Sequence, residues 1–170
     1  SLAKQGATQL NIFAISGSLR RASFNTALLN TCAEIAPEGM NISLADISAI
    51  PLYNGDDQAA GFPASVMTLA DQIRSADAVL IATPEYNYSI PGVLKNAIAW
   101  LSRVENQPFD DSQYHLRQVF VFLNGRLMNR PEAFVGGAHQ KFDENGKLTD
   151  EPTKEFLAAY LIAFEAWAKA

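Results

Sequence analysis

The sequence predicts an α/β protein with a doubly wound parallel sheet in three α/β/α layers. Strand-like and helix-like segments alternate along the chain, which is the order of consecutive β-α-β units. Residues 78–83 form a continuous apolar run, typical of a strand that is buried on both faces and lies centrally in a parallel sheet. The chain has 170 residues, of which 48% are hydrophobic and 18% charged. These values predict a single domain over residues 1–170.

The first part of the chain alternates between short apolar segments and amphipathic ones. Residues 9–15 are mostly apolar and are followed by serine and glycine, which predicts a strand and a turn. Apolar positions recur at helical spacing in 25–34 and again in 64–75, so both segments are predicted to be helices. Between them, residues 41–47 alternate as a strand does, whereas 49–63 contains two prolines and two glycines and predicts a loop.

The second part of the chain continues the alternation after the apolar run. Residues 92–103 are predicted to form a helix and 128–135 another strand. Residues 143–146 predict a turn between two short extended pieces, and 153–168 a closing helix. Residues 114–123 are apolar on all sides, which fits either a homo-oligomer interface or a helix buried within the chain.

Composition excludes several classes of function. Thirteen Lys and Arg against eighteen Asp and Glu give a net charge of −5, which disfavours nucleic acids and anionic membranes as partners. A single cysteine, Cys32, predicts a buried inert thiol, and the two histidines, His115 and His139, are too few to predict a metal site. No apolar run reaches the ~20 residues of a membrane span, and the first residues do not resemble a signal peptide. We therefore expect a cytoplasmic protein.

The loop after the first predicted strand has the composition of a phosphate-binding loop. It lies before a helix N-terminus, where free N–H groups and the helix dipole attract anions. The dinucleotide motif G-x-G-x-x-G and the motif G-x-x-x-x-G-K-[ST] are both absent, so a mononucleotide phosphate fits best. Capping of the helix is the alternative role for Ser23 and Asn25. The candidate phosphate ligands are Ser18, Arg20, Ser23, Asn25 and Thr26.

A second polar loop, residues 83–92, follows the apolar run. Its two prolines restrict the backbone and can hold loop amides at fixed positions. Tyr86 and Tyr88 could cover a planar ring, and Asn87 could hydrogen-bond the edge of a heterocycle. An ordinary structured loop is the alternative. Parallel strands end at the same edge of a sheet, so ligands bind where these two loops meet.

The two loops together resemble the NAD(P)H-dependent FMN reductase family, and most of all its quinone, azo and chromate reductases. The resemblance is carried by Gly17-Ser18-Leu19-Arg20-x-x-Ser23-x-Asn25 and by Thr83-Pro84-Glu85-Tyr86-Asn87-Tyr88-Ser89-x-Pro91-Gly92-x-Leu94-Lys95-Asn96-Ala97. It implies a flavodoxin-like fold, bound FMN and NAD(P)H as co-substrate. It further implies that the first loop holds the FMN phosphate and that Arg103 contacts the nicotinamide nucleotide or an anionic acceptor. The ribityl chain and isoalloxazine would be lined by Pro84, Glu85, Tyr86, Asn87, Tyr88 and Ser89.

One segment departs from the family pattern. Members of the family have a fourth buried strand after the helix that ends at Leu101-Ser102-Arg103, then a loop beside the flavin. Here 104–112 contains a proline, two aspartates and few apolar residues, which cannot form a central parallel strand. Either the protein has lost this strand, or the printed sequence omits a segment. We favour an omitted segment, because loss of a central strand would expose the hydrogen-bonding edges of both its neighbours.

The resemblance predicts an FMN-dependent oxidoreductase without a catalytic side chain. Hydride would pass from NAD(P)H to the flavin, and electrons then to a quinone, free flavin, azo compound or chromate. A flavodoxin-type electron carrier is the alternative, and so is a flavin-free binding protein if the fourth strand is truly lost. We expect a small-molecule acceptor and a homo-oligomer, either dimer or tetramer.

Overall fold

The structure is a computed structural model and describes residues 9–105 and 126–170. Three strands and five α-helices lie in this part of the chain, with a short 3₁₀ helix, η1. In chain order the elements are β1 (Leu10–Ser16), α1 (Phe24–Glu34), β2 (Met40–Leu44), α2 (Gly55–Ala60), α3 (Ala64–Arg74), β3 (Ala78–Ala82), α4 (Gly92–Leu101), η1 (Ala138–Gln140) and α6 (Glu151–Ala168).

The three strands form a parallel sheet in the order β2-β1-β3. Strand β1 lies at the centre and pairs with β2 from Leu10↔Met40 and with β3 from Ile12↔Ala78. Ser16 at the end of β1 stands opposite Ala82 at the end of β3. The two strands therefore end together, and the loops that follow them start side by side.

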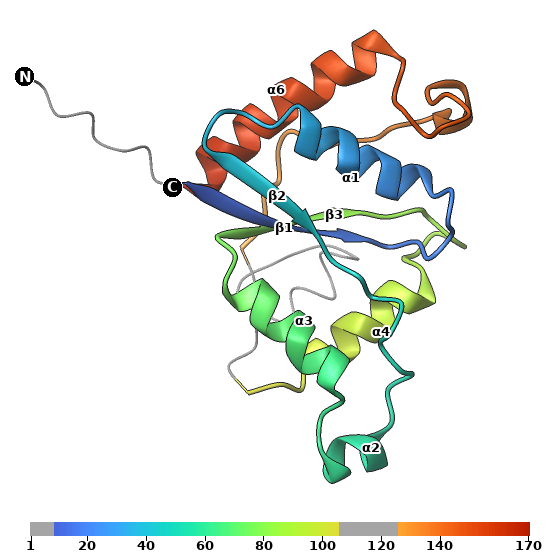
Figure 1. The fold of residues 1–170 in the computed structure, drawn as a ribbon, viewed down its shortest axis with the longest axis vertical. Coiled ribbons are helices and arrows are strands. Elements are labelled where there is room, and N and C mark those ends of the chain that lie inside the picture. Colours follow the sequence, from blue (N-terminus) through green and yellow to red (C-terminus); the bar gives the residue numbers. More distant parts are fainter. Residues whose placement is uncertain (1–8, 106–125) are drawn as a thin grey trace, which may run out of the picture.

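Helices cover both faces of the sheet, with α1 and α6 on one face and α3 and α4 on the other (Figure 1). Alternate residues of β1 point to opposite faces. Ile12 and Ala14 pack in the core under α1 and α6, whereas Phe13 and Ile15 pack against α3 and α4. The structure thus confirms the predicted three-layer α/β/α fold.

Cys32 belongs to the core between α1 and α6, as the sequence predicted. It is buried, and burial raises the pKa of its thiol to about 11. The reactive thiolate is therefore scarce at neutral pH, which makes Cys32 an inert core residue.

Helix α2 was not predicted, because it lies within the proline- and glycine-containing segment 49–63. Its first turn is stabilised by Asn54, whose side chain accepts a hydrogen bond from the Asp56 amide, and by the acidic residues Asp56 and Asp57. No residue of α2 is buried. An exposed helix has no apolar stripe to identify it in a sequence.

Strand β3 is parallel, as predicted, but the prediction that it is central was wrong for the described part of the sheet. There β3 pairs only with β1, and of its five residues only Leu80 is buried. The apolar run indicated burial of both faces of the strand, but it carries no information about the two hydrogen-bonding edges. Among the three described strands, the central one is β1.

The predicted strand over 128–135 is also wrong, because the structure has no strand within 126–135. Pro131 cannot donate a ladder hydrogen bond, and the largest apolar side chain, Phe134, is 83% exposed. Without burial of its apolar residues, the segment gains little from joining a sheet. The turn at 143–146 is confirmed by the antiparallel bridge between Phe142 and Leu148.

Two sequence predictions concern residues outside the described ranges. The first is that 104–112 does not form a central strand; of this segment only residues 104 and 105 are described. The second is the helix over 114–123. Within the described residues, no helix combines the length and the apolar composition needed to cross a membrane.

Candidate functional site

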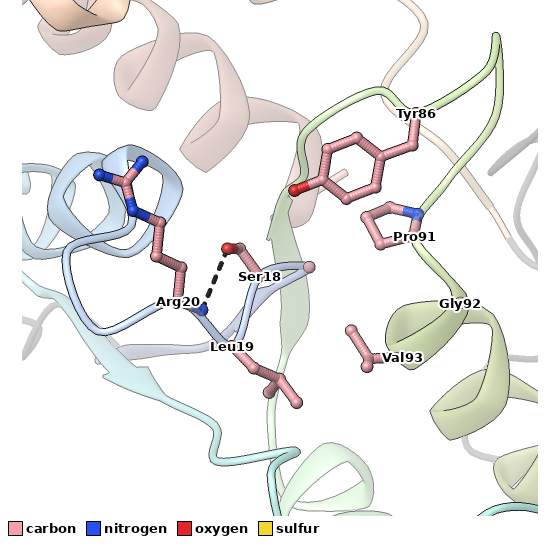
Figure 2. A pocket seen from close by; sticks show the side chains of 8 residues that line it. Ser18, Leu19, Arg20, Tyr86, Pro91, Gly92 and Val93 are labelled. Carbon is pink, nitrogen blue, oxygen red and sulfur yellow. Dashed lines mark hydrogen bonds between the residues drawn. The ribbon is translucent and has the colours of Figure 1, made fainter.

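A cavity of about 310 Å³ lies where the loops after β1 and β3 meet. Figure 2 shows Ser18 and Arg20 on one side of it, with Tyr86 and Pro91 on the other. The position agrees with the general rule that ligands of doubly wound sheets bind beyond the carboxyl ends of the strands. Its lining consists of Gly17, Ser18, Leu19, Arg20, Tyr86, Pro91, Gly92 and Val93.

The two loops are in direct contact at Gly17. Its amide donates a hydrogen bond of 2.8 Å to the Ala82 carbonyl. A Cβ atom at position 17 would lie 2.4 Å from the Thr83 Oγ1 atom and 2.8 Å from its Cβ. Only glycine allows this approach, because real Cβ atoms do not come so close to other heavy atoms. Glycine 17 therefore sets the spacing of the two walls of the cavity.

The first loop ends in a capped helix. Ser23 is the N-cap of α1, and its hydroxyl oxygen accepts a hydrogen bond from the Thr26 amide. Its hydroxyl proton is not used by that bond. The other first-turn amides of α1 have no partner within the helix, as at every helix N-terminus. This loop thus combines capping with free donors of the kind that can bind an anion.

Thr26 is engaged in a chain of hydrogen bonds behind the loop. Its hydroxyl donates to the Ser16 Oγ atom over 2.9 Å, and the Ser16 hydroxyl donates to the Ser18 carbonyl over 3.4 Å. Because the Ser16 proton goes to the Ser18 carbonyl, Thr26 must be the donor between the two hydroxyls. The amide and the hydroxyl of Thr26 thus both donate to serine hydroxyl oxygens of the protein, and these hydrogen bonds stabilise the loop.

Arg20 lies at the rim of the first loop. Its amide donates to the Ser18 Oγ atom over 3.4 Å, and its guanidinium lies 5.8 Å from the centroid of the Phe24 ring. The cation–π contact keeps the charge beside the start of α1. Helix α4 adds a second positive end, because Gly92 and Val93 in its first turn line the same cavity.

The second loop is a tight hairpin at 86–89. The amide of Tyr86 donates to the Ser89 carbonyl and the amide of Ser89 to the Tyr86 carbonyl, each over 2.9 Å. The two central residues have positive φ angles, 52° at Asn87 and 60° at Tyr88, as in a type I′ turn. Asparagine tolerates this conformation, but a bulky tyrosine is strained there by about 1–3 kcal/mol.

The structure brings Ser18, Arg20 and Tyr86 together in the lining of the cavity. Arg103 is not part of that lining; it follows α4 and lies 5.7 Å from the centroid of the Tyr53 ring. The other predicted site residues do not line the cavity. At the start of α1 these are the N-cap Ser23 with Asn25 and Thr26 in the first turn. In the second loop they are Pro84, Glu85, Asn87, Tyr88 and Ser89.

Five lining residues were absent from the predicted site set. Three of them belong to the second loop and the start of α4, where Pro91 is the N-cap. The motif stretches already contained four of the five, but glycines and apolar residues lack the polar side chains by which the candidates were chosen. The missed residues are Gly17, Leu19, Pro91, Gly92 and Val93.

The chemistry of the cavity fits the phosphate and polyol end of FMN. One wall offers hydroxyls, an arginine and a helix N-terminus, which are the groups that bind phosphate. The opposite wall offers the Tyr86 ring and Pro91, which can contact an aromatic ring. Because Gly17 has no side chain, the backbone of the first loop lies close to the second loop.

Comparison with known proteins decides the family. The model of the NADPH-dependent FMN reductase family matches residues 10–112, more than half of the chain. The chain belongs to this family. An NAD(P)H-dependent FMN reductase of Pseudomonas aeruginosa is 45% identical, with 94% of this chain and 96% of that protein covered. A quinone reductase of Escherichia coli K12 is 46% identical, with 92% and 94% covered.

A solved structure agrees with this assignment. FerB of Paracoccus denitrificans, a flavoenzyme described as an NAD(P)H:(acceptor) oxidoreductase, is 32% identical to this FMN reductase family member. The two structures have a TM-score of 0.80, with 94% of this chain and 97% of FerB covered. These findings confirm the predicted flavodoxin-like fold, an enzyme of the oxidoreductase class, FMN as cofactor and NAD(P)H as co-substrate.

The relatives also contain residues that this chain lacks. The alignment with the P. aeruginosa reductase runs over 177 positions, although only 94% of the 170 residues here take part. About 160 residues are thus aligned, so about 17 positions of the alignment are gaps in this chain. A strand and its following loop would need about this number of residues.

Proposed function

We propose that this protein is an FMN-dependent reductase that oxidises NAD(P)H and passes the electrons to a quinone. The observation that carries the proposal is the cavity between a phosphate-binding loop and a hairpin with an aromatic side chain, in a chain 46% identical to a quinone reductase. A potato relative named NAD(P)H:quinone oxidoreductase, 43% identical over 94% of this chain, supports the same acceptor. Free flavin, azo compounds and chromate are further acceptors in this proposal. The site of action is the cytoplasm.

In this proposal the first loop holds the phosphate of FMN. Ser18, Arg20, Ser23 and Asn25 donate to its oxygens, since a phosphate group only accepts. Thr26 contributes indirectly by fixing Ser16, because its own donors are already used. The positive N-terminus of α1 adds to the attraction.

The second loop and the start of α4 face the rest of the cofactor. Pro84, Glu85, Asn87 and Ser89 offer backbone groups, and Tyr86 presents its ring across the cavity (Figure 2). Arg103 would serve an anionic substrate only after leaving the Tyr53 ring. The bound flavin supplies the redox chemistry, and the residues of this chain bind it, orient it and leave one face accessible.

Steady turnover is the direct test. Purified protein mixed with FMN, NADPH or NADH and 1,4-naphthoquinone should oxidise the nucleotide continuously, at a rate proportional to the protein concentration. The absorbance of the reduced nucleotide measures it, and protein without added acceptor under anaerobic conditions is the control. An electron carrier would give no such turnover. A protein that is still colourless after incubation with FMN and removal of the unbound flavin would contradict the proposal entirely.

We also propose that the protein is a homo-oligomer, with residues 114–123 at the interface. The support is the sequence alone, because Val119, Phe120, Val121 and Phe122 form an apolar run with no polar face. A dimer or tetramer would cover this run. Phe120→Glu should then lower the mass measured by light scattering to that of a smaller species, because a charge cannot be buried unpaired at an interface. A wild-type monomer at micromolar concentration would contradict the proposal.

A further inference from the structure

We propose that Phe142, a core residue outside both loops of the candidate site, is a positioning residue for the phosphate of FMN. It acts on Arg20 through the ring of Phe24. The inference rests on the proposed function, since it takes Arg20 as a ligand of the phosphate. Its basis is a row of contacts that runs from the start of α6 to the guanidinium at the rim of the cavity.

The guanidinium of Arg20 contacts the ring of Phe24. Its Cζ atom lies 5.8 Å from the ring centroid, within the ~6 Å range of a cation–π contact. Unlike an ion pair with a carboxylate, this contact does not use the N–H donors of the guanidinium, which can then donate to a phosphate. It also limits the rotamers of a long side chain that would otherwise have to be ordered when the ligand binds.

Phe24 is in turn held by Phe142. Phe24 is the first residue of α1, next to the N-cap Ser23, and it is half-buried. The centroids of the two phenylalanine rings are 5.4 Å apart, the usual separation of an aromatic pair, and their planes meet at 33°. Phe142 is buried in the core between the sheet, α1 and α6. A ring at the start of the helix is therefore fixed by a ring in the core.

The position of Phe142 is set by a hairpin, residues 142–148, that lies against α1. Phe142 and Leu148 form the antiparallel bridge that closes this hairpin. At its turn, a Cβ atom on Gly146 would lie 4.0 Å from the Cβ atom of Ala27, so the backbone of the turn is close to α1. The hairpin thus approaches the first turn of α1 at two places, Phe24 and Ala27.

Lys141 anchors the same hairpin to the start of α6. Its Nζ atom donates to the Asp150 Oδ2 atom over 3.1 Å and to the Thr153 Oγ1 atom over 2.6 Å. Asp150 is the N-cap of α6 and also accepts from the Thr153 amide. Figure 1 shows this connection, in orange, beside the N-terminal end of α1. The first turns of α1 and α6 are therefore joined through the hairpin, next to the candidate phosphate site.

Loss of the Phe142 ring should weaken the binding of FMN but not that of riboflavin. In Phe142→Leu the core stays apolar, but Phe24 loses the ring that packs against it. Arg20 then has more rotamers to give up when the phosphate binds. Ordering one long side chain corresponds to about three- to tenfold in affinity. Riboflavin has no phosphate, so this cost does not arise for it.

Two variants and one control separate this role from general destabilisation. Phe142→Leu removes the ring in the core, and Phe24→Leu removes the half-buried ring that contacts Arg20. Phe164→Leu is the matched control, because Phe164 is buried in the same core but stacks on other aromatic residues of α6. FMN and riboflavin are titrated into each apoprotein and followed by flavin fluorescence, and the melting temperature is recorded.

We expect the Kd of FMN to rise by about three- to tenfold in Phe142→Leu and in Phe24→Leu, with the Kd of riboflavin unchanged. Phe164→Leu should leave both constants unchanged, although it lowers the melting temperature as Phe142→Leu does. In an Arg20→Ala background, Phe142→Leu should not weaken FMN further, because two residues that act through one contact are not additive. A merely structural role would produce neither the difference between the flavins nor this loss of additivity.

Three outcomes would overturn the inference. They are an unchanged Kd of FMN in Phe142→Leu, an equal loss of FMN and riboflavin, and a full further loss in the Arg20→Ala background. Normal binding of FMN by Arg20→Ala alone would refute the phosphate role of Arg20 and the inference with it. Failure of the proposed function would appear separately, in the wild type, as absence of FMN binding or of NAD(P)H turnover with 1,4-naphthoquinone.

Discussion

The double variant Ser18→Ala with Arg20→Ala should bind FMN at least about 100-fold more weakly than the wild type, because hydrogen bonds to charged groups contribute ~1.5–3 kcal/mol each. Both residues line the cavity in the loop before α1, and among the described residues no other cationic side chain belongs to the lining. Removal of the guanidinium leaves the phosphate with neutral donors and the helix dipole alone. Titration of FMN into the apoprotein, followed by flavin fluorescence, measures the effect.

Riboflavin provides the sharpest control for this variant, because it has the ring and the ribityl chain of FMN but no phosphate. Its affinity should be nearly the same in the wild type and in the double variant. Arg21→Ala is the matched protein control, since Arg21 is a neighbouring exposed arginine outside the cavity lining. Equal weakening of FMN and riboflavin would show that the loop had lost its shape rather than its phosphate contacts.

Salt should act on the same contact. The affinity of the wild type for FMN should fall with rising ionic strength, because mobile ions screen the attraction between the arginine and the phosphate. The Arg20→Ala variant should show a smaller dependence on salt. This comparison separates a charge contribution from one of packing, which salt would not weaken.

Periodicity in the sequence predicted most of the described secondary structure because most elements bury one side. Strand β1 supplies alternate residues to two cores, and α3 turns Val66, Leu69 and Ile73 inward. Both patterns are visible as spacing of apolar residues. Helix α2 has no buried residue, and its formation depends on the Asn54 cap and two first-turn aspartates, which the glycines and prolines around them obscured.

The failures at β3 and at 128–135 have a different origin. An apolar run records how much of a segment is buried, but pairing along its edges depends on residues distant in the sequence. For β3 the run predicted the strand correctly, but among the described residues β3 pairs only with β1. At 128–135 the aliphatic and aromatic residues are interrupted by Asn129, Arg130 and Pro131, and the segment stays outside the sheet.

The site was predicted by polar residue types, and this choice explains what was missed. Ser18, Arg20 and Tyr86 have functional groups that suggest a ligand, and all three line the cavity. Gly17 has none. Its importance lies in a distance between two loops that are about 65 residues apart in the sequence, and such a distance becomes visible only when the chain is folded.

Gly17→Ala should therefore damage the site, although the substitution adds only one methyl group. The new methyl group would lie 2.4 Å from the Thr83 Oγ1 atom and 3.2 Å from the Thr83 Cα atom, so the backbone of one loop must move. Overpacking of this kind costs about 1–3 kcal/mol, and the shift displaces Ser18 directly. We expect a lower melting temperature and an affinity for FMN reduced by at least about tenfold.

A double-mutant cycle tests whether the contact itself is responsible. Thr83→Gly removes both side-chain atoms that the new methyl group would meet, although it leaves the Cα atom. Gly17→Ala should then be less harmful in the Thr83→Gly background than in the wild type, with a coupling energy of about 1 kcal/mol or more. Gly55→Ala is the matched control, because a Cβ at Gly55 meets no atom within 4 Å. Additive effects of the two substitutions would show that the added methyl group does not act through a clash with the Thr83 side chain, and that the loss of affinity has another cause.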